Sequence, residues 1–166
     1  KCCVNFMLKK ILISFYFFLF FSGFSIANEK NLATFGVGLW DWNDTYTAGL
    51  FVAEYRHGKR YGPFKPMIGG LVNTDHGFYI YSGVRMDLYL TRKIVLTPNF
   101  APGIYSKGDG KDLGHAIEFR SGLDLAYRRK NGARIAAEVH HLSNASISND
   151  NPGTETLLFT YSVPLN

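Results

Sequence analysis

The chain has almost no cysteine, because Cys2 and Cys3 are the only two among its 166 residues. Without cysteine in its body, it cannot be a small secreted scaffold held by disulfides, and it has neither a thiolate nucleophile nor a cysteine-ligated metal site. A large excess of basic or acidic residues is also missing once the first 27 residues are set aside. The formal net charge is +5, but the first 27 residues hold three lysines and no acidic residue, which leaves 15 basic against 13 acidic residues. This near balance removes the main support for nucleic-acid binding.

Helical and metal-binding patterns are absent as well. No window has the periodicity of an amphipathic helix, and there is no internal repeat or low-complexity linker. The histidines His57, His76, His115 and His140 show no metal-ligand spacing. The sequence therefore predicts neither a metal nor a cofactor.

The first 27 residues have the pattern of a secretory signal peptide. Lys9 and Lys10 precede a short apolar run, which small residues close at Ala27. This pattern predicts cleavage after Ala27, and it suggests that translation starts at Met7. A retained membrane anchor is the alternative, although the run is short for a spanning helix. Residues 28–166 are then expected to form a single domain.

The body of the chain divides into strand-like runs separated by turn residues. The clearest turn contains Asn131-Gly132, a pair that suits a two-residue hairpin. Eight antiparallel strands of about ten residues are typical of a small closed β-barrel. The predicted strands are residues 32–40, 46–56, 64–72, 77–90, 93–103, 113–128, 133–143 and 155–163.

Alternation along the runs places apolar and charged residues on opposite faces. In run 113–128, Ile117, Phe119 and Leu123 share one face, whereas Glu118 and Arg120 share the other. A soluble lipid-binding barrel would point the apolar face inward, and an outer-membrane barrel would point it at lipid. The signal peptide, the many aromatic residues and the strand count together favour an all-β, eight-stranded transmembrane barrel in the bacterial outer membrane.

The connections support this assignment. With both termini in the periplasm, the long connections become extracellular loops, and the short basic ones become periplasmic turns. The expected loops are residues 41–45, 73–76, 106–112 and 144–154, and the expected turns are residues 57–60, 91–93 and 128–132. Trp40 and Trp42 flank the first loop and are expected to anchor the barrel at the membrane interface.

The last two strands carry a candidate catalytic triad. By alternation, His141 and Ser143 continue the lipid-facing side of one strand at its extracellular end, and Glu155 does so on the next. His140 points the opposite way, into the lumen. A serine, a histidine and a carboxylate are the nucleophile, base and orienting group of a serine hydrolase. Because a polar triad facing lipid is costly, its position predicts hydrolysis of a lipid acyl ester in the outer leaflet.

The motif His141-x-Ser143-Asn144, followed by Asn151-Pro152-Gly153-x-Glu155, resembles the PagL family of outer-membrane lipid A 3-O-deacylases. The resemblance implies that His141 is the base, Ser143 the nucleophile and Glu155 the orienting acid. It associates Asn144, Asn151 and Gly153 with the oxyanion hole and active-site loop. The substrate would be lipid A within lipopolysaccharide, which would lose its 3-hydroxyacyl chain at the 3-position. The resemblance further implies a barrel that can form a homodimer and needs no metal.

Two other interpretations remain open from the sequence. A non-catalytic outer-membrane barrel with a structural or surface-binding role would explain the strands but not the triad. A soluble periplasmic lipid-binding barrel would need the apolar face inside. One departure concerns assembly, since such barrels often end on an aromatic residue and this chain ends Pro164-Leu165-Asn166.

Overall fold

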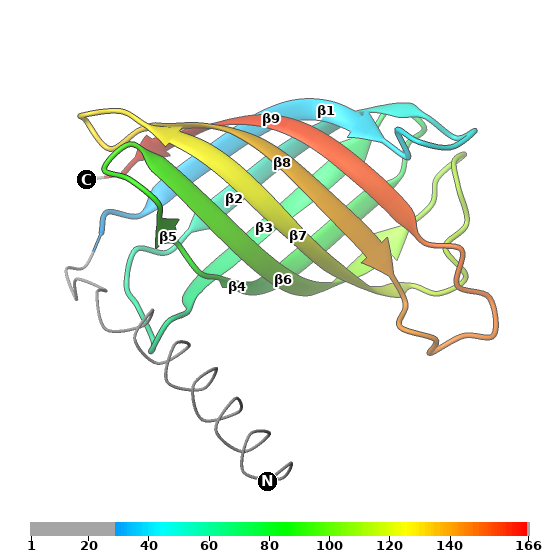
Figure 1. The fold of residues 1–166 in the computed structure, drawn as a ribbon. Helices are drawn as coiled ribbons and strands as arrows, with labels where there is room; N and C mark the ends of the chain where they lie inside the picture. The colour runs from blue at the N-terminus through cyan, green and yellow to red at the C-terminus, as the bar shows by residue number, and fades with distance from the viewer. Residues whose placement is uncertain (1–28, 166) are drawn as a thin grey trace, which may run out of the picture.

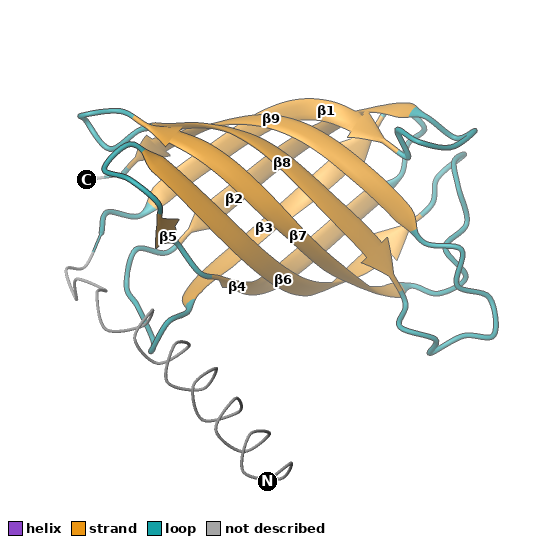
Figure 2. Ribbon diagram, viewed as in Figure 1, coloured by secondary structure: helices purple, strands orange, loops and turns teal. Residues whose placement is uncertain are grey.

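The structure, a computed structural model, describes residues 29–165. These residues form a closed antiparallel β-barrel (Figure 1). The predicted signal peptide lies outside the described residues. Strands and connecting loops account for the described fold (Figure 2). Within residues 29–165 there is no helix long and apolar enough to cross a membrane.

Consecutive strands pair from β1 to β4 and from β5 to β9, β9 pairs with β1, and β4 pairs with β6 to close the ring. The short strand β5 also pairs with β6, so β4 and β5 are two parts of one interrupted strand, and the barrel has the predicted eight. The strands are β1 (Leu32–Trp40), β2 (Ala48–Arg56), β3 (Lys65–Asn73), β4 (Phe78–Arg85), β5 (Leu88–Tyr89), β6 (Ile94–Ser106), β7 (Ile117–Arg128), β8 (Arg134–Ser143) and β9 (Thr154–Pro164).

Two predicted strands differ clearly from the observed ones, whereas the ends of the others shift by at most three residues. The run 77–90 is interrupted between β4 and β5. The run 113–128 begins only at Ile117, because the residues before it belong to a loop that folds into the mouth of the barrel. Leu113 in that loop is fully buried, and Gly114 adopts a positive φ of 84° where it approaches the backbone of Asp150. Tertiary packing therefore shortens this strand.

The outer surface of the barrel is apolar. Phe35, Ile104 and Phe159 are each about 60% exposed, and they belong to three different strands. Exposed apolar side chains around a closed sheet are expected where the wall faces lipid. The soluble alternative, with its apolar face inside, is therefore wrong.

The lumen is filled by buried charged side chains, most of which form ion pairs. Five cations and five carboxylates are buried there among the described strands and the β4–β5 junction: Arg56, Lys65, Arg85, Arg120, Arg134, Glu54, Asp87, Glu118, Asp124 and Glu138. Arg56 is the most connected, since it pairs with Glu54, with Asp124 at 3.0 Å and with Glu138 at 2.9 Å. Matched charges of this kind fill a narrow lumen without leaving a net buried charge.

Both described ends of the chain lie at one rim of the barrel, called the inner rim here (Figure 1). Loops 41–47, 74–77, 107–116 and 144–153 lie at the opposite rim, called the outer rim.

One expectation for the outer rim is wrong. Trp40 is buried and its ring stacks on Tyr105 at 5.4 Å, because it ends β1 on the lumen side. It therefore plugs the barrel mouth and does not anchor the membrane interface.

The Arg56 ion pairs generate a stability prediction. Arg56→Met should lower the free energy of unfolding by about 3–5 kcal/mol, because it leaves buried carboxylates without their cation. Urea titration of the folded barrel in detergent would measure the loss. Arg92→Met is the matched control, since Arg92 is exposed in the turn after β5 and its removal should change stability by about 0.5 kcal/mol or less. Equal unfolding midpoints for the two variants would contradict a stabilising role for the lumen charges.

Candidate active site

The β8–β9 hairpin places the predicted triad residues at the outer rim. His141 and Glu155 are direct partners in the antiparallel register. Ser143 is the last residue of β8 and lies on the same outward face as His141. His140 is buried on the lumen side, as alternation predicted. The cross-strand register therefore determines which of these side chains can meet outside the barrel.

The His141 ring and the Glu155 carboxylate form the central contact of the site. Nδ1 of His141 lies 3.0 Å from Oε1 of Glu155. Because an ionised carboxylate can only accept, Nδ1 carries the proton and Nε2 keeps its lone pair. The two side chains are 50% and 38% exposed, so the pair lies at the lipid-facing surface. This arrangement suits a general base held in one tautomer.

Ser143 lies beside this pair but is not bonded to it. It is half-buried, and within the described residues no hydrogen bond joins its hydroxyl to the His141 ring. Residues two apart on a strand are about 6.5–7 Å apart at the backbone, a separation that side chains can partly bridge. Hydrogen bonds of this type often form only when substrate is bound.

A glycine defines the direction in which the His141 ring points. Gly153 has a positive φ of 64°, and a β-carbon on it would lie 3.0 Å from Cε1 and 3.6 Å from Nε2 of His141. The free ring nitrogen therefore lies close to Gly153, at the end of the 144–153 loop. Ser121 pairs with His141 from β7, on the other side of β8 from Glu155.

The two asparagines of the motif organise the 144–153 loop. The backbone N–H of Asn144 donates to Oδ1 of Asn151 at 2.9 Å. The buried side-chain amide of Asn144 donates to the carbonyls of Leu113, at 3.0 Å, and Asp150, at 2.8 Å. Both of its amide hydrogens are thus used, one within this loop and one towards the 107–116 loop. Nδ2 of the exposed Asn151 donates to no acceptor within the described residues, so it remains available at the surface.

Next to the site, hydrogen bonds join a group of outer-rim residues that the sequence did not predict to meet. The buried Asp41 accepts hydrogen bonds from Thr154, at 2.8 Å, and from Lys111, at 2.8 Å. Lys111 also donates to Asp44 at 3.0 Å, and this hydrogen bond lowers the pKa of the Asp44 carboxyl. No pattern in the sequence links these residues, because 113 positions separate Asp41 from Thr154.

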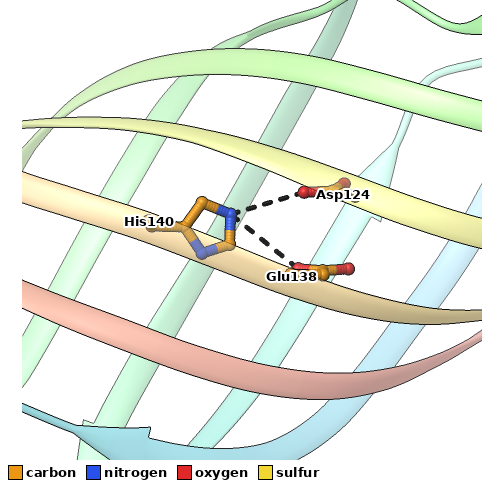
Figure 3. Close-up of side chains that lie close together, drawn as sticks. All are labelled: Asp124, Glu138 and His140. Carbon is orange, nitrogen blue, oxygen red and sulfur yellow. Dashed lines mark ion pairs between the residues drawn. The ribbon is translucent and has the colours of Figure 1, made fainter. Parts of the chain in front are cut away.

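A second group of potential ligands lies in the lumen. Asp124, Glu138 and His140 place three ligand atoms within 4.8 Å of one another, with the ring nitrogen between the two carboxylates (Figure 3). Nε2 of His140 accepts a hydrogen bond from Arg120 at 2.7 Å, and Arg56 pairs with both carboxylates. Because Arg120 occupies the ring nitrogen and Arg56 neutralises both carboxylates through their other oxygens, the cluster suits the lumen packing better than a metal ion.

The chain is similar to known proteins in its sequence pattern and in its fold. The pattern of the family described as lipid A 3-O-deacylase (PagL) matches residues 32–164. The chain is similar to the crystal structure of the outer membrane enzyme PagL, with a TM-score of 0.62 and 15% identity over 81% of this chain and 99% of that one.

Two further solved barrels show the same fold. A de novo designed transmembrane β-barrel has a TM-score of 0.58 and 10% identity over 84% of this chain and 100% of that one. Neisserial surface protein A (NspA) has a TM-score of 0.52 and 9% identity over 81% of this chain and 95% of that one. No curated protein sequence matches the chain. The family match extends over most of the sequence, and the eight-stranded wall is that of an outer-membrane protein. The chain therefore belongs to the lipid A 3-O-deacylase (PagL) family and is an outer-membrane β-barrel.

Proposed function

We propose that the protein hydrolyses the ester linking the 3-hydroxyacyl chain to the 3-position of lipid A, with Ser143 as nucleophile. The observation that carries this proposal is the His141–Glu155 pair on the outward face of the barrel, with Ser143 on the same face. A site on the outward face at the outer rim meets lipids of the outer leaflet. An acyl ester there lies near the headgroups, where polar side chains cost least.

The proposed reaction has two steps. The Ser143 hydroxyl attacks the ester carbonyl carbon, and its proton passes to Nε2 of His141. Collapse of the tetrahedral intermediate breaks the bond to the sugar oxygen, which takes that proton and leaves as the lipid A hydroxyl. Water, deprotonated by His141, then releases the fatty acid and restores Ser143. Glu155 holds the histidine tautomer and stabilises the imidazolium formed in each step.

The loop residues have separate roles in this mechanism. Nδ2 of Asn151 is an available donor at the surface, which suits stabilisation of the oxyanion. Asn144 orders the loop through its hydrogen bonds to Leu113 and Asp150. Gly153 allows the loop to approach the His141 ring. No metal has a part in these steps.

The nucleophile can be tested in living cells. With the protein produced in the outer membrane of a Gram-negative host, mass spectra of lipid A should show loss of one 3-hydroxyacyl chain. Ser143→Ala should lower this activity by about 10³-fold or more, because only the nucleophile is removed. Ser121→Ala is the matched control, since Ser121 also faces outward beside His141 and should leave activity unchanged.

Substitution of the other two triad residues should lower activity to different extents, according to their roles. His141→Ala should approach the loss of the serine variant, whereas Glu155→Ala should retain more activity, because the orienting carboxylate is the least indispensable member. Full activity in Ser143→Ala would overturn the assignment of the nucleophile. Unchanged lipid A from folded, membrane-inserted wild-type protein would favour a non-catalytic barrel.

Gly153 provides an independent test of the ring position. Gly153→Ala should lower kcat by about 10–100-fold, because the added methyl group strains the backbone and displaces His141. Gly62→Ala separates the effect of backbone strain from the effect of displacing His141. Gly62 has a similar φ of 62° at the inner rim, but a β-carbon there would meet nothing within 4 Å. Activity assays on both purified variants should show a loss only for Gly153→Ala, and equal losses would contradict the proposed contact.

A further inference from the structure

The carboxylate of Asp41 lies at the centre of the outer-rim loops. Asp41 begins the first loop with a positive φ of 50° and is fully buried. Its Oδ1 accepts hydrogen bonds from Lys111 and Thr154, and its Oδ2 accepts one from the backbone N–H of Tyr46 at 3.3 Å. Three separate parts of the chain thus meet at one buried carboxylate. A buried charge needs such partners, so this group will tolerate few other arrangements.

One branch from Asp41 leads to the Glu155 side of the site. The Thr154 hydroxyl that donates to Asp41 belongs to the residue directly before Glu155, at the start of β9. The backbone N–H of Asp41 also donates to the carbonyl of Glu155 itself at 2.8 Å. Asp41 therefore holds the backbone on both sides of the Glu155 side chain.

A second branch leads to the Ser143 side. Lys111 donates to Asp41, and its own carbonyl accepts from the Tyr105 hydroxyl at 2.7 Å. Two residues later, the carbonyl of Leu113 accepts from the side chain of Asn144, the residue directly after Ser143. The loop that carries Lys111 therefore connects Asp41 to the end of β8.

Both branches reach the open end of the β8–β9 hairpin. Ser143 is the last residue of β8 and Thr154 the first of β9, so the pairing between these two strands ends at the triad. Strand ends open more readily than strand interiors. An anchor on the lumen side compensates for this without obstructing lipid on the outer side.

We propose that Asp41, Lys111 and Thr154, called the rim clasp here, are positioning residues that hold Glu155 and Ser143 in the geometry needed for catalysis. The inference rests on the proposed function, since it concerns the same reaction. The side chain of Lys111 is only 11% exposed and is paired with Asp41 and Asp44. Its charge is thus neutralised by ion pairs within the protein. Burial works to lower the pKa of Lys111, but the hydrogen bonds to the two aspartates raise it, so Lys111 remains charged at neutral pH.

The first test is a double-mutant cycle between Thr154 and Glu155. Thr154→Val keeps the shape of the side chain and removes the hydroxyl that donates to Asp41. In purified protein it should lower kcat about tenfold and leave KM within about twofold. In the Glu155→Ala background the same substitution should cause no further loss, because Thr154 belongs to the branch that leads to Glu155 and that branch then has no carboxylate to position. Equal losses in both backgrounds would show a general structural effect and overturn the proposal.

A spectroscopic measurement keeps this test decisive if Glu155→Ala is too slow to assay. In wild-type protein the Nδ1 proton of His141 is hydrogen-bonded to Glu155 and should give a strongly downfield proton resonance. Thr154→Val should shift this resonance upfield or broaden it, because the carboxylate is held less firmly. An unchanged resonance would contradict a role for Thr154 in placing Glu155.

The second test compares two lysines of the same loop. Lys111→Met should lower kcat about tenfold, and Lys111→Arg should recover part of the loss because it restores a charged donor. Lys107→Met is the control, since Lys107 makes only an exposed ion pair with Asp112 at 2.9 Å and should stay within about twofold of wild type. Equal activity in the two methionine variants would reject the clasp.

Failure of the clasp and failure of the proposed function give different results. If Ser143→Ala is inactive but Thr154→Val and Lys111→Met have full activity, only the clasp is wrong. If Ser143→Ala is as active as wild type, the proposed function is wrong.

Discussion

The strict alternation of side chains along a closed antiparallel ladder is the constraint on which the rest of this structure depends. In lipid every backbone N–H and C=O must be paired internally, and a closed barrel achieves this without a free edge. Once the ladder is closed, each residue faces either lipid or lumen, and a shift of one residue would exchange the two sets. The placement of His141 outside and His140 inside follows directly from this constraint.

The same constraint places two different groups of polar residues on opposite faces of the barrel wall. Inside, Arg56 and its carboxylate partners form a fully buried network that fills the lumen. Outside, His141 and Glu155 form a half-exposed pair at the rim, where a lipid ester can reach them. The lumen network stabilises the barrel wall, and the wall in turn holds the register of β8 against β9. The proposed catalysis at the surface therefore depends on a charged interior that does not face the lipid.

Features that depend on local alternation could be predicted from the sequence. The eight strands, the lipid-facing stripe and the outward placement of His141, Ser143 and Glu155 all follow from period-two patterns within one or two strands. The contact between His141 and Glu155 could be expected because a single hairpin joins them.

Features that depend on distant contacts could not be predicted. Asp41 meets Thr154 across 113 positions and Lys111 across 70, so no local pattern indicates the rim clasp. Tryptophan is common at membrane interfaces, but strand parity and stacking on Tyr105 turn Trp40 inward. Alternation alone extends the strand before Ile117, because the position of these residues in the barrel mouth depends on contacts with the 144–153 loop.

The most direct test of the central claim is the site at which a serine-directed fluorophosphonate reacts with the folded protein. An activated serine forms a covalent phosphonyl adduct, whereas an ordinary surface serine does not. Peptide mass mapping should find the adduct on Ser143 in wild-type protein, and it should disappear in His141→Ala. An adduct on Ser121, or no adduct on folded protein that deacylates lipid A, would contradict a Ser143 nucleophile activated by His141.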